Sequence, residues 1–552
     1  MKSLFHSPFL LLLLVAVVSP LTDALSSTSN RKSAIIVGGG PIGLSTALTL
    51  ATRHKDEFKE ILVIETSQKL VTFDVGKAFL YNVNARGQSF LKSILPKVQE
   101  KLKIRGVEQG KNTIGRFLVV PGDTTTPLPE NKSVSMNVAS TDEKDDDDDD
   151  SRISYWIPRH EMVKILQEEV EKHGDMIQVK SGYECSTIKP EEEEETLQVC
   201  VKEVSSGKEE IHSCHLVVGA DGWKSKVRDI VLNDESNDFT NQWNIQKERK
   251  KLFQIKQWIS PASNLRIKVL TFPPQFKIPN SEDKEDLVSD SQSVYSLRSL
   301  KQGPRSYLSL GMLPMKDNNA IRPANIIGRP DHDVWTKQSG PELKEYFQQS
   351  FPRWNGFDHM VSDQEWDRVA KEEGTRFPPC QYSPGMAISS PTGKSGIVLV
   401  GDAVHAFPPD IGQGINAGYT DVLALDESLT SNDGNEKSSL GQRLMNYETQ
   451  RAPEIKALIR LARFGSPYQY RQPHRIDRFK RNLWVMNVML RLLLSKIVPF
   501  SFISPSSIMM TQDPKLSYEE VMKRADSTTT KLSLFLVGIL VSVCWKMGVG
   551  PF

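Results

Sequence analysis

Residues 33–43 read S-A-I-I-V-G-G-G-P-I-G, and this stretch decides the fold. The apolar run Ala34–Val37 predicts a buried parallel strand that stops in a glycine turn. Gly38, Gly40 and Gly43 follow the G-x-G-x-x-G spacing at the start of the next helix. The first glycine permits the tight turn, the second lets the backbone approach a pyrophosphate, and the third lets the helix pack closely on the strand. The free N–H groups at the helix start attract phosphate.

A second apolar run supports this interpretation. Ile61–Ile64 predicts another buried strand, and it ends in Glu65. An acid about 20 residues beyond the last glycine of such a turn can bind a ribose hydroxyl. The combination therefore predicts a dinucleotide site. The alternative is a glycine-rich turn followed by a solvent-facing glutamate.

Composition excludes several classes of function. The chain has 552 residues, enough for two or three domains with substantial cores. Its 69 basic and 68 acidic residues balance, so no overall field favours nucleic acid. The five cysteines are scattered without a C-x-x-C pair, which argues against a disulfide framework and against a zinc site. We expect neither a metal nor a nucleic-acid partner.

Both ends of the chain suggest a membrane. Lys2 precedes the apolar run Phe9–Val18, which is typical of a signal peptide, with an uncleaved signal anchor as the alternative. Near the other end, Leu532–Trp545 is apolar and has lysines on both sides, which predicts a membrane-spanning helix. A buried terminal helix is the alternative. The apolar segment Asn482–Ile503, which carries Arg491, predicts a helix on the membrane, a lid over a substrate cavity, or a buried core helix.

An acidic segment interrupts the first half of the chain. Residues Asp123–Ser151 are rich in Thr and Pro and then acidic, with Asp145–Asp150 uninterrupted. Such a run repels itself and supplies no core residues, so we expect a disordered insertion. Directly after it, Arg159 opens an amphipathic helix.

Two later strands also end in acid-and-glycine turns. His215–Ala220 predicts a buried strand that runs into Asp221, and Gly396–Val400 predicts another that runs into Asp402. An acid at the end of a strand can bind a hydroxyl of a cofactor, and glycine-rich backbone at a helix start can approach a flat ring. His405 follows the third strand, where it is either a structural histidine or a catalytic base.

These three motifs, in this order, resemble those of the flavoprotein hydroxylases that use one FAD and an external pyridine nucleotide. The residues that carry the resemblance are Gly38, Gly40, Pro41, Ile42, Gly43, Asp221, Asp402, Gly412, Gly414, Ile415 and Asn416. The resemblance implies that these residues, together with Glu65, Arg86 and Arg159, bind FAD. Within the family, the kynurenine 3-monooxygenases are the most similar branch, and similarity to them extends from about residue 33 to the end.

The resemblance implies an FAD-dependent monooxygenase. NADPH would bind transiently as cosubstrate, and O₂ would supply one oxygen atom to an aromatic or similar electron-rich small molecule. The substrate-carboxylate arginine of the family falls on Arg116, whose alternative role is that of a surface residue at a strand edge. The family's substrate-pocket tyrosine and asparagine fall near Glu130 and Gly465, where neither residue stands. Other substrates, an epoxidase or reductase of isoprenoid lipids, and a catalytically silent membrane flavoprotein therefore stay open.

The expected fold is α/β: a Rossmann-like FAD-binding domain with an inserted β-sheet substrate domain, C-terminal helices and a membrane anchor. We expect the protein at an endomembrane or organelle membrane, with the mitochondrial outer membrane as the alternative. The expected divisions are residues 1–30 as signal peptide or signal anchor, 33–106, 151–235 and 376–430 as the FAD-binding domain, 107–122 and 240–375 as the substrate domain, 123–150 as the disordered insertion, 440–525 as the helical region and 530–549 as the transmembrane helix.

Overall fold

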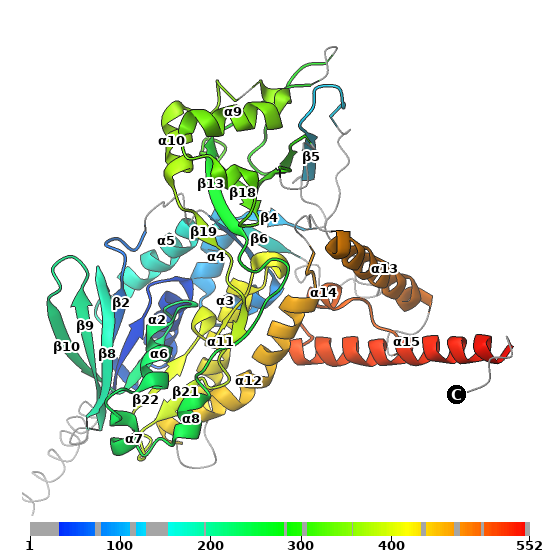
Figure 1. The fold of residues 1–552 in the computed structure, drawn as a ribbon. Helices are drawn as coiled ribbons and strands as arrows, with labels where there is room; N and C mark the ends of the chain where they lie inside the picture. Colours follow the sequence, from blue (N-terminus) through cyan, green and yellow to red (C-terminus); the bar gives the residue numbers. More distant parts are fainter. Residues whose placement is uncertain are drawn as a thin grey trace, which may run out of the picture.

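The computed structural model describes residues 32–71, 79–110, 117–128, 153–191, 195–280, 284–300, 306–355, 357–431, 438–468, 475–497 and 502–546 (Figure 1). The signal-like segment 1–30, Arg116 and most of the insertion 123–150 lie outside these residues.

A six-stranded sheet lies at the centre of the described chain, in the order β21-β22-β11-β1-β2-β7. Its strands are β1 (Lys32–Val37), β2 (Phe58–Glu65), β7 (Ile177–Ser181), β11 (Leu216–Gly219), β21 (Ala387–Ser389) and β22 (Gly396–Leu399). Only β21 runs antiparallel to its neighbour. β11 and β22 are buried along their whole length, as expected for parallel strands covered on both faces.

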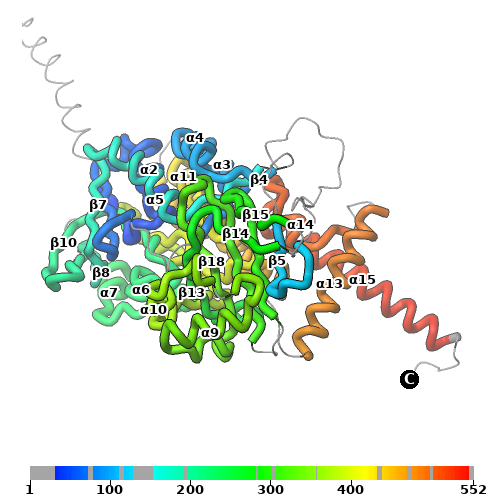
Figure 2. The backbone as a smooth tube through the Cα atoms, turned by 90° about the horizontal axis from the view of Figure 1, so that it is seen from above, coloured from blue at the N-terminus to red at the C-terminus, as the bar shows by residue number. Residues whose placement is uncertain are grey.

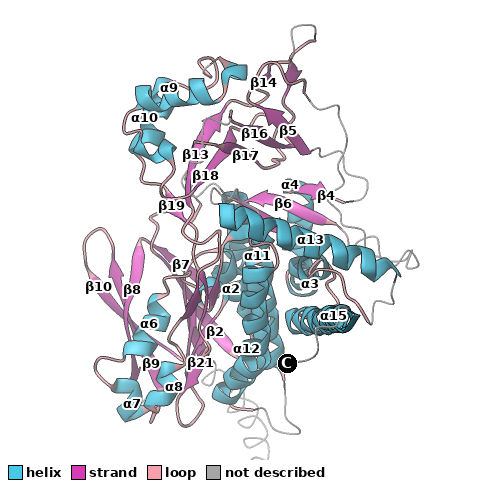
Figure 3. Cartoon of the chain, turned by 45° about the vertical axis from the view of Figure 1, so that its right-hand side comes forward, coloured by secondary structure: helices cyan, strands magenta, loops and turns pink. Residues whose placement is uncertain are grey.

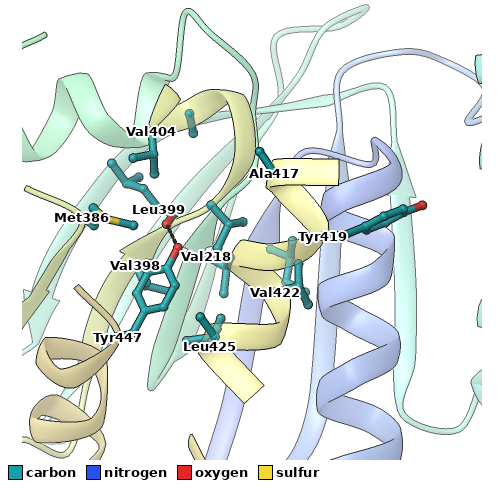
Figure 4. Close-up of a cluster of buried hydrophobic side chains, with 14 of the residues drawn as sticks. Val218, Met386, Val398, Leu399, Val404, Ala417, Tyr419, Val422, Leu425 and Tyr447 are labelled. Atoms are coloured by element: carbon teal, nitrogen blue, oxygen red, sulfur yellow. Dashed lines mark hydrogen bonds between the residues drawn. The ribbon is translucent and has the colours of Figure 1, made fainter. Parts of the chain in front are cut away.

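Four long helices pack around this sheet: α2 (Pro41–Arg53), α5 (Arg159–Val170), α11 (Gly414–Thr430) and α12 (Leu440–Phe464). α2 packs against α5 and α11, and α11 packs in turn against α12. Figure 4 shows the part of the core where α11 and α12 meet β11 and β22. In this core the Tyr447 hydroxyl of α12 donates a hydrogen bond of 3.0 Å to the Leu399 carbonyl oxygen of β22, so the helix is tied to the strand end that carries the third motif.

Two small antiparallel sheets flank the central sheet. One contains β3 (Leu80–Val83), β6 (Ser154–Pro158) and β4 (Val107–Gln109), with α3 (Ala85–Ile94) and α4 (Pro96–Arg105) nearby. The other contains β8 (Tyr183–Glu191), β9 (Thr196–Glu203) and β10 (Glu209–Cys214), and α6 (Lys226–Asn233), α7 (Asp238–Gln242) and α8 (Lys247–Lys251) follow it.

A second, mixed sheet forms its own layer beyond the first (Figure 3). It contains β19 (Thr375–Arg376), β13 (Arg266–Phe272), β18 (Arg322–Gly328), β17 (Ser309–Met312), β16 (Val294–Arg298) and β5 (Phe117–Pro121). The short pair β14 (Lys277–Ile278) and β15 (Leu287–Val288) and the helices α9 (Gly340–Ser350) and α10 (Asp363–Lys371) complete this layer. It has a separate aromatic core around Phe347 and Trp366. A connector of β12 (Lys256–Trp258), β20 (Cys380–Tyr382) and β23 (His405–Ala406) joins it to the first layer.

The chain ends in helices that project from the body (Figure 2). These are α13 (Arg475–Ile497), the short α14 (Ser507–Met510) and α15 (Tyr518–Lys546). The first turns of α15 pack on α12, and from Leu534 onward its apolar side chains are exposed. Among the described residues α15 is the one helix long and apolar enough to cross a membrane.

The expected mixed α/β fold with C-terminal helices is confirmed. The segment 107–122 is divided, because β4 pairs with β6 beside the first layer whereas β5 joins the second. Helix α3 begins at Ala85, because the Asn84 side chain accepts a hydrogen bond from the Arg86 N–H and caps it.

Candidate active site

The three sequence motifs meet at one edge of the central sheet. Val37 lies beside Gly219 in the parallel register of β1 and β11, and Gly219 lies beside Leu399 in that of β11 and β22. The Ala220 N–H donates to the Val37 carbonyl oxygen at 2.8 Å, and the Val400 N–H donates to the Gly219 carbonyl oxygen at 2.9 Å. Loops far apart in the chain are therefore neighbours where the strands end, which is where open α/β sheets bind ligands.

The first glycine turn is closely packed on one side and open on the other. Gly38 has a φ of +112°, and a Cβ there would clash with the Ala220 carbonyl oxygen. A Cβ at Gly43 would likewise meet the carbonyl oxygen of Gly38. Gly40 precedes α2 with no side-chain cap, and a Cβ there would meet no atom within 4 Å. The free N–H groups of α2 thus face a space that fits a phosphate.

Glu65 stands at the end of β2 and holds this turn. Its carboxylate accepts hydrogen bonds from the N–H groups of Gly39 at 2.8 Å and Ser67 at 2.9 Å. Burial alone would raise the pKa of Glu65, but these hydrogen bonds outweigh burial and keep the pKa below its ordinary value. Glu65 is therefore an ionised acceptor beside the glycines.

Asp221 caps α6 with one oxygen and leaves the other without a partner. Its Oδ2 accepts from the N–H groups of Lys226 at 2.6 Å and Val227 at 3.1 Å. Its Oδ1 is buried and has no hydrogen-bond partner among the described residues. Burial raises the pKa of Asp221. An orphaned acceptor at this sheet edge fits a ligand that brings a hydroxyl donor.

Asp402 lies with Arg159 and Tyr81, a residue that the sequence analysis missed. Burial raises the pKa of Tyr81 to about 12; Arg159 acts in the opposite direction by its charge and a hydrogen bond, and the Asp402 charge adds to the increase. β3 pairs with β6, which places Tyr81 near the start of α5 and hence near Arg159. No motif in the sequence marks Tyr81, because this neighbourhood depends on the pairing of two distant strands.

Asp402 is open to solvent and yet has protein groups around it. Its side chain is exposed, and yet desolvation by the surrounding protein raises its pKa; the neighbouring His405 lowers it and Asp421 raises it. A solvent-accessible carboxylic acid that is nevertheless surrounded by protein fits the wall of a ligand site.

A buried ionic network holds the turn that carries Asp402. The Asp421 carboxylate lies 2.7 Å from Nε2 of His405, accepts from Arg451 at 2.6 and 3.0 Å, and accepts from the Gly401 N–H at 2.9 Å. Burial opposes ionisation of Asp421, but His405 and Arg451 outweigh it and keep its pKa low. His405 is completely buried, so this geometry favours the structural role over the catalytic one.

The glycines of the third motif also face open space. A Cβ at Gly412 or Gly414 would meet no atom within 4 Å. The neighbouring side chains turn inward instead. Ile415 is buried, and the fully buried Asn416 accepts from the Asn84 N–H at 3.0 Å and donates to the Asn82 carbonyl oxygen at 2.9 Å, which ties α11 to β3.

Asp410 lies in the same loop and was not singled out from the sequence. It is buried, and neither of its carboxylate oxygens has a hydrogen-bond partner among the described residues. Burial raises the pKa of Asp410 from 3.8 to about 7. A carboxylic acid that titrates near neutrality, two residues before Gly412, can hold or accept a proton at this edge of the site.

Arg86 faces the C-terminal segment. Its guanidinium donates to the carbonyl oxygens of Asp513, at 2.8 Å, and Leu516, and lies 4.7 Å from the centre of the Tyr518 ring. The Tyr518 hydroxyl donates to Gln413 at 3.0 Å, so the start of α15 reaches the glycine loop directly. A contact of Arg86 with the cofactor stays a prediction.

The site as a whole fits a dinucleotide with a flat ring system. A Cβ at Gly40, Gly412 or Gly414 would meet no atom within 4 Å, Asp221 Oδ1 has no hydrogen-bond partner among the described residues, and Asp402 is exposed. This arrangement offers phosphate-binding N–H groups, hydroxyl acceptors and close approach of backbone in one place.

Comparisons with known proteins agree with this geometry. The family model described as "FAD binding domain" matches residues 99–252 and 387–462. A kynurenine 3-monooxygenase from Sus scrofa is 23% identical over 525 residues, which cover 94% of this chain and 92% of that protein. A kynurenine 3-monooxygenase from Cryptococcus neoformans is 24% identical over 453 residues, covering 79% of this chain and 78% of that protein.

A solved structure has the same fold. The tetrameric form of 2-methyl-3-hydroxypyridine-5-carboxylic acid oxygenase matches with a TM-score of 0.51 and 16% sequence identity, and the match covers 88% of this chain and 99% of that one. The resemblance to the FAD-dependent aromatic hydroxylases is thus confirmed, the solved structure supports the fold, and the protein is an FAD-dependent oxidoreductase.

Proposed function

We propose that this protein is a membrane-attached FAD monooxygenase that uses NADPH and O₂ to hydroxylate an aromatic or similar electron-rich small molecule. The observation that carries the proposal is the meeting of three glycine-and-acid turns at one sheet edge. The relatives named kynurenine 3-monooxygenase make kynurenine the first substrate to test.

In this proposal, the backbone of the glycine turns binds FAD. Gly38, Gly40, Gly43 and the start of α2 receive the pyrophosphate, and Glu65 accepts from a ribose hydroxyl. Pro41 and Ile42 shape the turn. A Cβ at Gly401 would lie 3.3 Å from the Ile42 side chain, and one at Gly418 would lie 2.6 Å from it. Ile42 therefore packs the first motif against the third.

Four side chains orient and polarise the bound cofactor in this proposal. Asp402 and Asp221 accept from its hydroxyl groups. Arg159 carries a positive charge near Asp402, and Tyr81 stays protonated at neutral pH because its pKa is about 12. Gly412 and Gly414 let the loop backbone approach the ring system. When bound, FAD accepts electrons from the pyridine nucleotide and uses O₂ to oxidise the substrate.

Substrate binding is assigned on separate grounds. Arg116 is proposed to hold a substrate anion, as the family resemblance implies, and lies just before β5 of the second sheet. In this proposal the second sheet contributes to the substrate pocket and helps to exclude water during the reaction.

Membrane attachment is supported by the two projecting helices. The residues of α15 from Lys531 to Trp545 would extend about 22 Å as a helix, which is shorter than the hydrocarbon core of about 30 Å, so spanning would require local thinning of the bilayer or flanking residues that reach the interface. Helix α13 exposes an apolar stripe at spacings of three and four residues: Phe479, Leu483, Met486, Leu490, Leu493 and Ile497. An apolar stripe turned outward needs an apolar environment. We place the protein at an endomembrane or organelle membrane, with the mitochondrial outer membrane as the alternative.

The test uses the full-length holoprotein in a neutral detergent. NADPH is added anaerobically and the flavin absorbance is followed; air and L-kynurenine are then added, and oxygen uptake and a product heavier by one oxygen atom are measured. We expect NADPH to bleach the flavin and kynurenine to accelerate bleaching. Asp402→Asn should lose bound flavin, whereas the exposed control Asp56→Asn should retain it.

Each alternative has its own signature in this assay. A flavin that stays oxidised with NADPH would identify a silent flavoprotein and refute the proposal. Bleaching followed by substrate reduction without oxygen incorporation would identify a reductase. Bleaching that kynurenine does not change would retain the monooxygenase and exclude this substrate.

A further inference from the structure

A cavity of about 580 Å³ lies at the base of the projecting helices. Its walls come from α12, α13, the start of α14, α15 and the loop that follows β12. Cavities of this size hold a small organic ligand. The cavity adjoins the glycine loop of the third motif, because a Cβ at Gly465 in its wall would lie 3.6 Å from the Ile411 side chain.

Positive charge predominates in the cavity. Arg460, Arg463, Lys480 and Arg491 line it, and Asp526 is the one carboxylate among its described lining residues. Asp526 is paired with Arg460 at 2.9 Å, so three cationic side chains are left in excess.

These three cations have no carboxylate partner among the described residues. Arg491 is only 7% exposed and donates to neutral oxygens, those of Asn487 at 2.9 Å, Thr529 at 2.8 Å and the Ala525 carbonyl at 3.3 Å. Arg463 lies over the rings of Trp258 and Phe464. The charge of Asp526 acts on Arg491 from a distance, but Asp526 forms its ion pair with Arg460, and a buried cation without an ion-pair partner favours an anionic ligand.

A buried hydroxyl points to the same ligand chemistry. Ser506 lines the cavity and is 6% exposed, and its Oγ has no hydrogen-bond partner among the described residues. An O–H donor in this position can be satisfied by an anionic oxygen.

The polarity of α13 is reversed relative to a helix of a soluble protein. Lys480, Trp484, Asn487, Val488 and Arg491 face the cavity at spacings of three and four residues, while the apolar stripe faces outward. The cavity therefore has a cationic interior with apolar patches, beside two helices with apolar outer surfaces.

We propose that this cavity binds an anionic amphiphile: a carboxylate or phosphate head held by Arg463, Lys480, Arg491 and Ser506, with an apolar tail along Trp484, Val488 and Met522 toward the exposed faces of α13 and α15. The ligand comes either from solution as a free amphiphilic acid or from the bilayer as an anionic lipid. This site is distinct from the sheet edge that we assign to FAD.

Native mass spectrometry of the full-length holoprotein in neutral detergent tests the proposal by counting bound ligand. The probes are palmitate, the uncharged palmityl alcohol, dioleoylphosphatidylglycerol, the zwitterionic dioleoylphosphatidylcholine, and inorganic phosphate. We expect one palmitate or one phosphatidylglycerol to bind at least tenfold more tightly than its uncharged or zwitterionic counterpart. Inorganic phosphate, which lacks a tail, should bind at least tenfold more weakly.

Variants locate the binding. Arg463→Gln combined with Lys480→Gln should weaken binding of the anionic probe at least tenfold. Arg478→Gln combined with Arg481→Gln removes the same charge from exposed residues of α13 that do not line the cavity, and should change nothing. Asp526→Asn removes the one lining carboxylate and should tighten binding two- to fivefold, which keeps the test decisive if the first double variant folds poorly.

Two outcomes support the proposal and identify the source. Palmitate binding that also accelerates anaerobic flavin reduction indicates a free acid that enters the reaction. Phosphatidylglycerol binding without an effect on the flavin indicates a membrane lipid. Equal binding of palmitate and palmityl alcohol, or binding unaffected by both the Arg463/Lys480 and the Asp526 changes, overturns the proposal. Because bound ligand is counted without turnover, failure here leaves the proposed monooxygenase reaction intact, and the reverse also holds.

Discussion

Replacing Asp410 by Asn tests the least satisfied charge in the candidate active site. Both carboxylate oxygens of Asp410 are buried without a partner, and burial raises its pKa from 3.8 to about 7. A group whose pKa is higher in the folded state binds its proton more tightly there, so it destabilises the fold once the unfolded chain has lost that proton. The cost is absent at low pH, grows above pH 3.8 and is complete slightly above pH 7.

The magnitude follows from the two pKa values. Each pKa unit is worth about 1.4 kcal/mol, so the cost of Asp410 is about 2 kcal/mol at pH 5 and about 4 kcal/mol at pH 8. Asn cannot ionise and lacks this dependence. A buried amide without partners carries its own cost of about 1–3 kcal/mol, but that cost is the same at both pH values. The difference between variant and wild type should therefore move by about 2.5 kcal/mol in favour of the variant from pH 5 to pH 8.

Urea unfolding of the full-length holoprotein, followed by tryptophan fluorescence at pH 5 and pH 8, measures this quantity. Asp56→Asn serves as the control, since Asp56 is an exposed aspartate. The difference in unfolding free energy between Asp56→Asn and wild type should be the same at pH 5 and at pH 8. If Asp410→Asn shifts stability equally at both pH values, Asp410 has the same pKa folded and unfolded. The isolation of its carboxyl group, and with it the proton-holding role in the loop, would then be wrong.

Three further predictions concern the same site. Gly40→Ala should weaken FAD binding at least tenfold in a flavin-fluorescence titration with little change in melting temperature, because its Cβ meets no protein atom. Gly38→Ala should lower both the FAD affinity and the melting temperature. Equal FAD affinity of Gly40→Ala and wild type would contradict the phosphate assignment. Asp421→Asn leaves the buried Arg451 without its ion-pair partner and should lower the free energy of unfolding by about 3–5 kcal/mol in urea at pH 7. Because the pKa of Asp421 is lowered in the fold, the stabilisation by Asp421 should disappear as the pH falls through its folded pKa. A destabilisation that is unchanged at pH 3 would contradict a lowered pKa. Tyr81→Phe should keep FAD bound but slow NADPH-driven flavin reduction about tenfold, or about 1.4 kcal/mol, equally from pH 6 to pH 9 because the Tyr81 pKa is about 12; an unchanged rate would remove Tyr81 from the site.

Local requirements made part of the site predictable from the sequence. A phosphate at a helix start needs glycine at positions 38 and 40 for different reasons: Gly38 for its backbone conformation and Gly40 for space. Both requirements fall within three residues of the chain. Glu65 ends the neighbouring strand, so the number of residues between the glycine turn and Glu65 indicates that the two lie close together in space. The roles assigned to these residues stay predictions, but their meeting at one edge is observed.

Other residues were beyond prediction because their surroundings come from distant parts of the chain. Tyr81 reaches Arg159 only through the pairing of β3 with β6, across an insertion of low sequence complexity. Asn416 has the sequence context of a cofactor ligand, yet its side chain ties α11 to β3. The family resemblance assigns Arg86 to FAD, and in the structure Arg86 contacts the C-terminal segment more than 400 residues later.

The sequence by itself determined a dinucleotide site and a mixed α/β fold, because the spacing of glycines and acids at strand ends is set by backbone geometry that acts over a few residues. The tertiary structure alone decided which charges are satisfied. Asp410 has no partner, Asp421 has three, and Arg491 faces a cavity on the inner side of a helix whose outer side is apolar. Burial and charge pairing depend on every element packed around a group, and that environment exists only once the chain has folded.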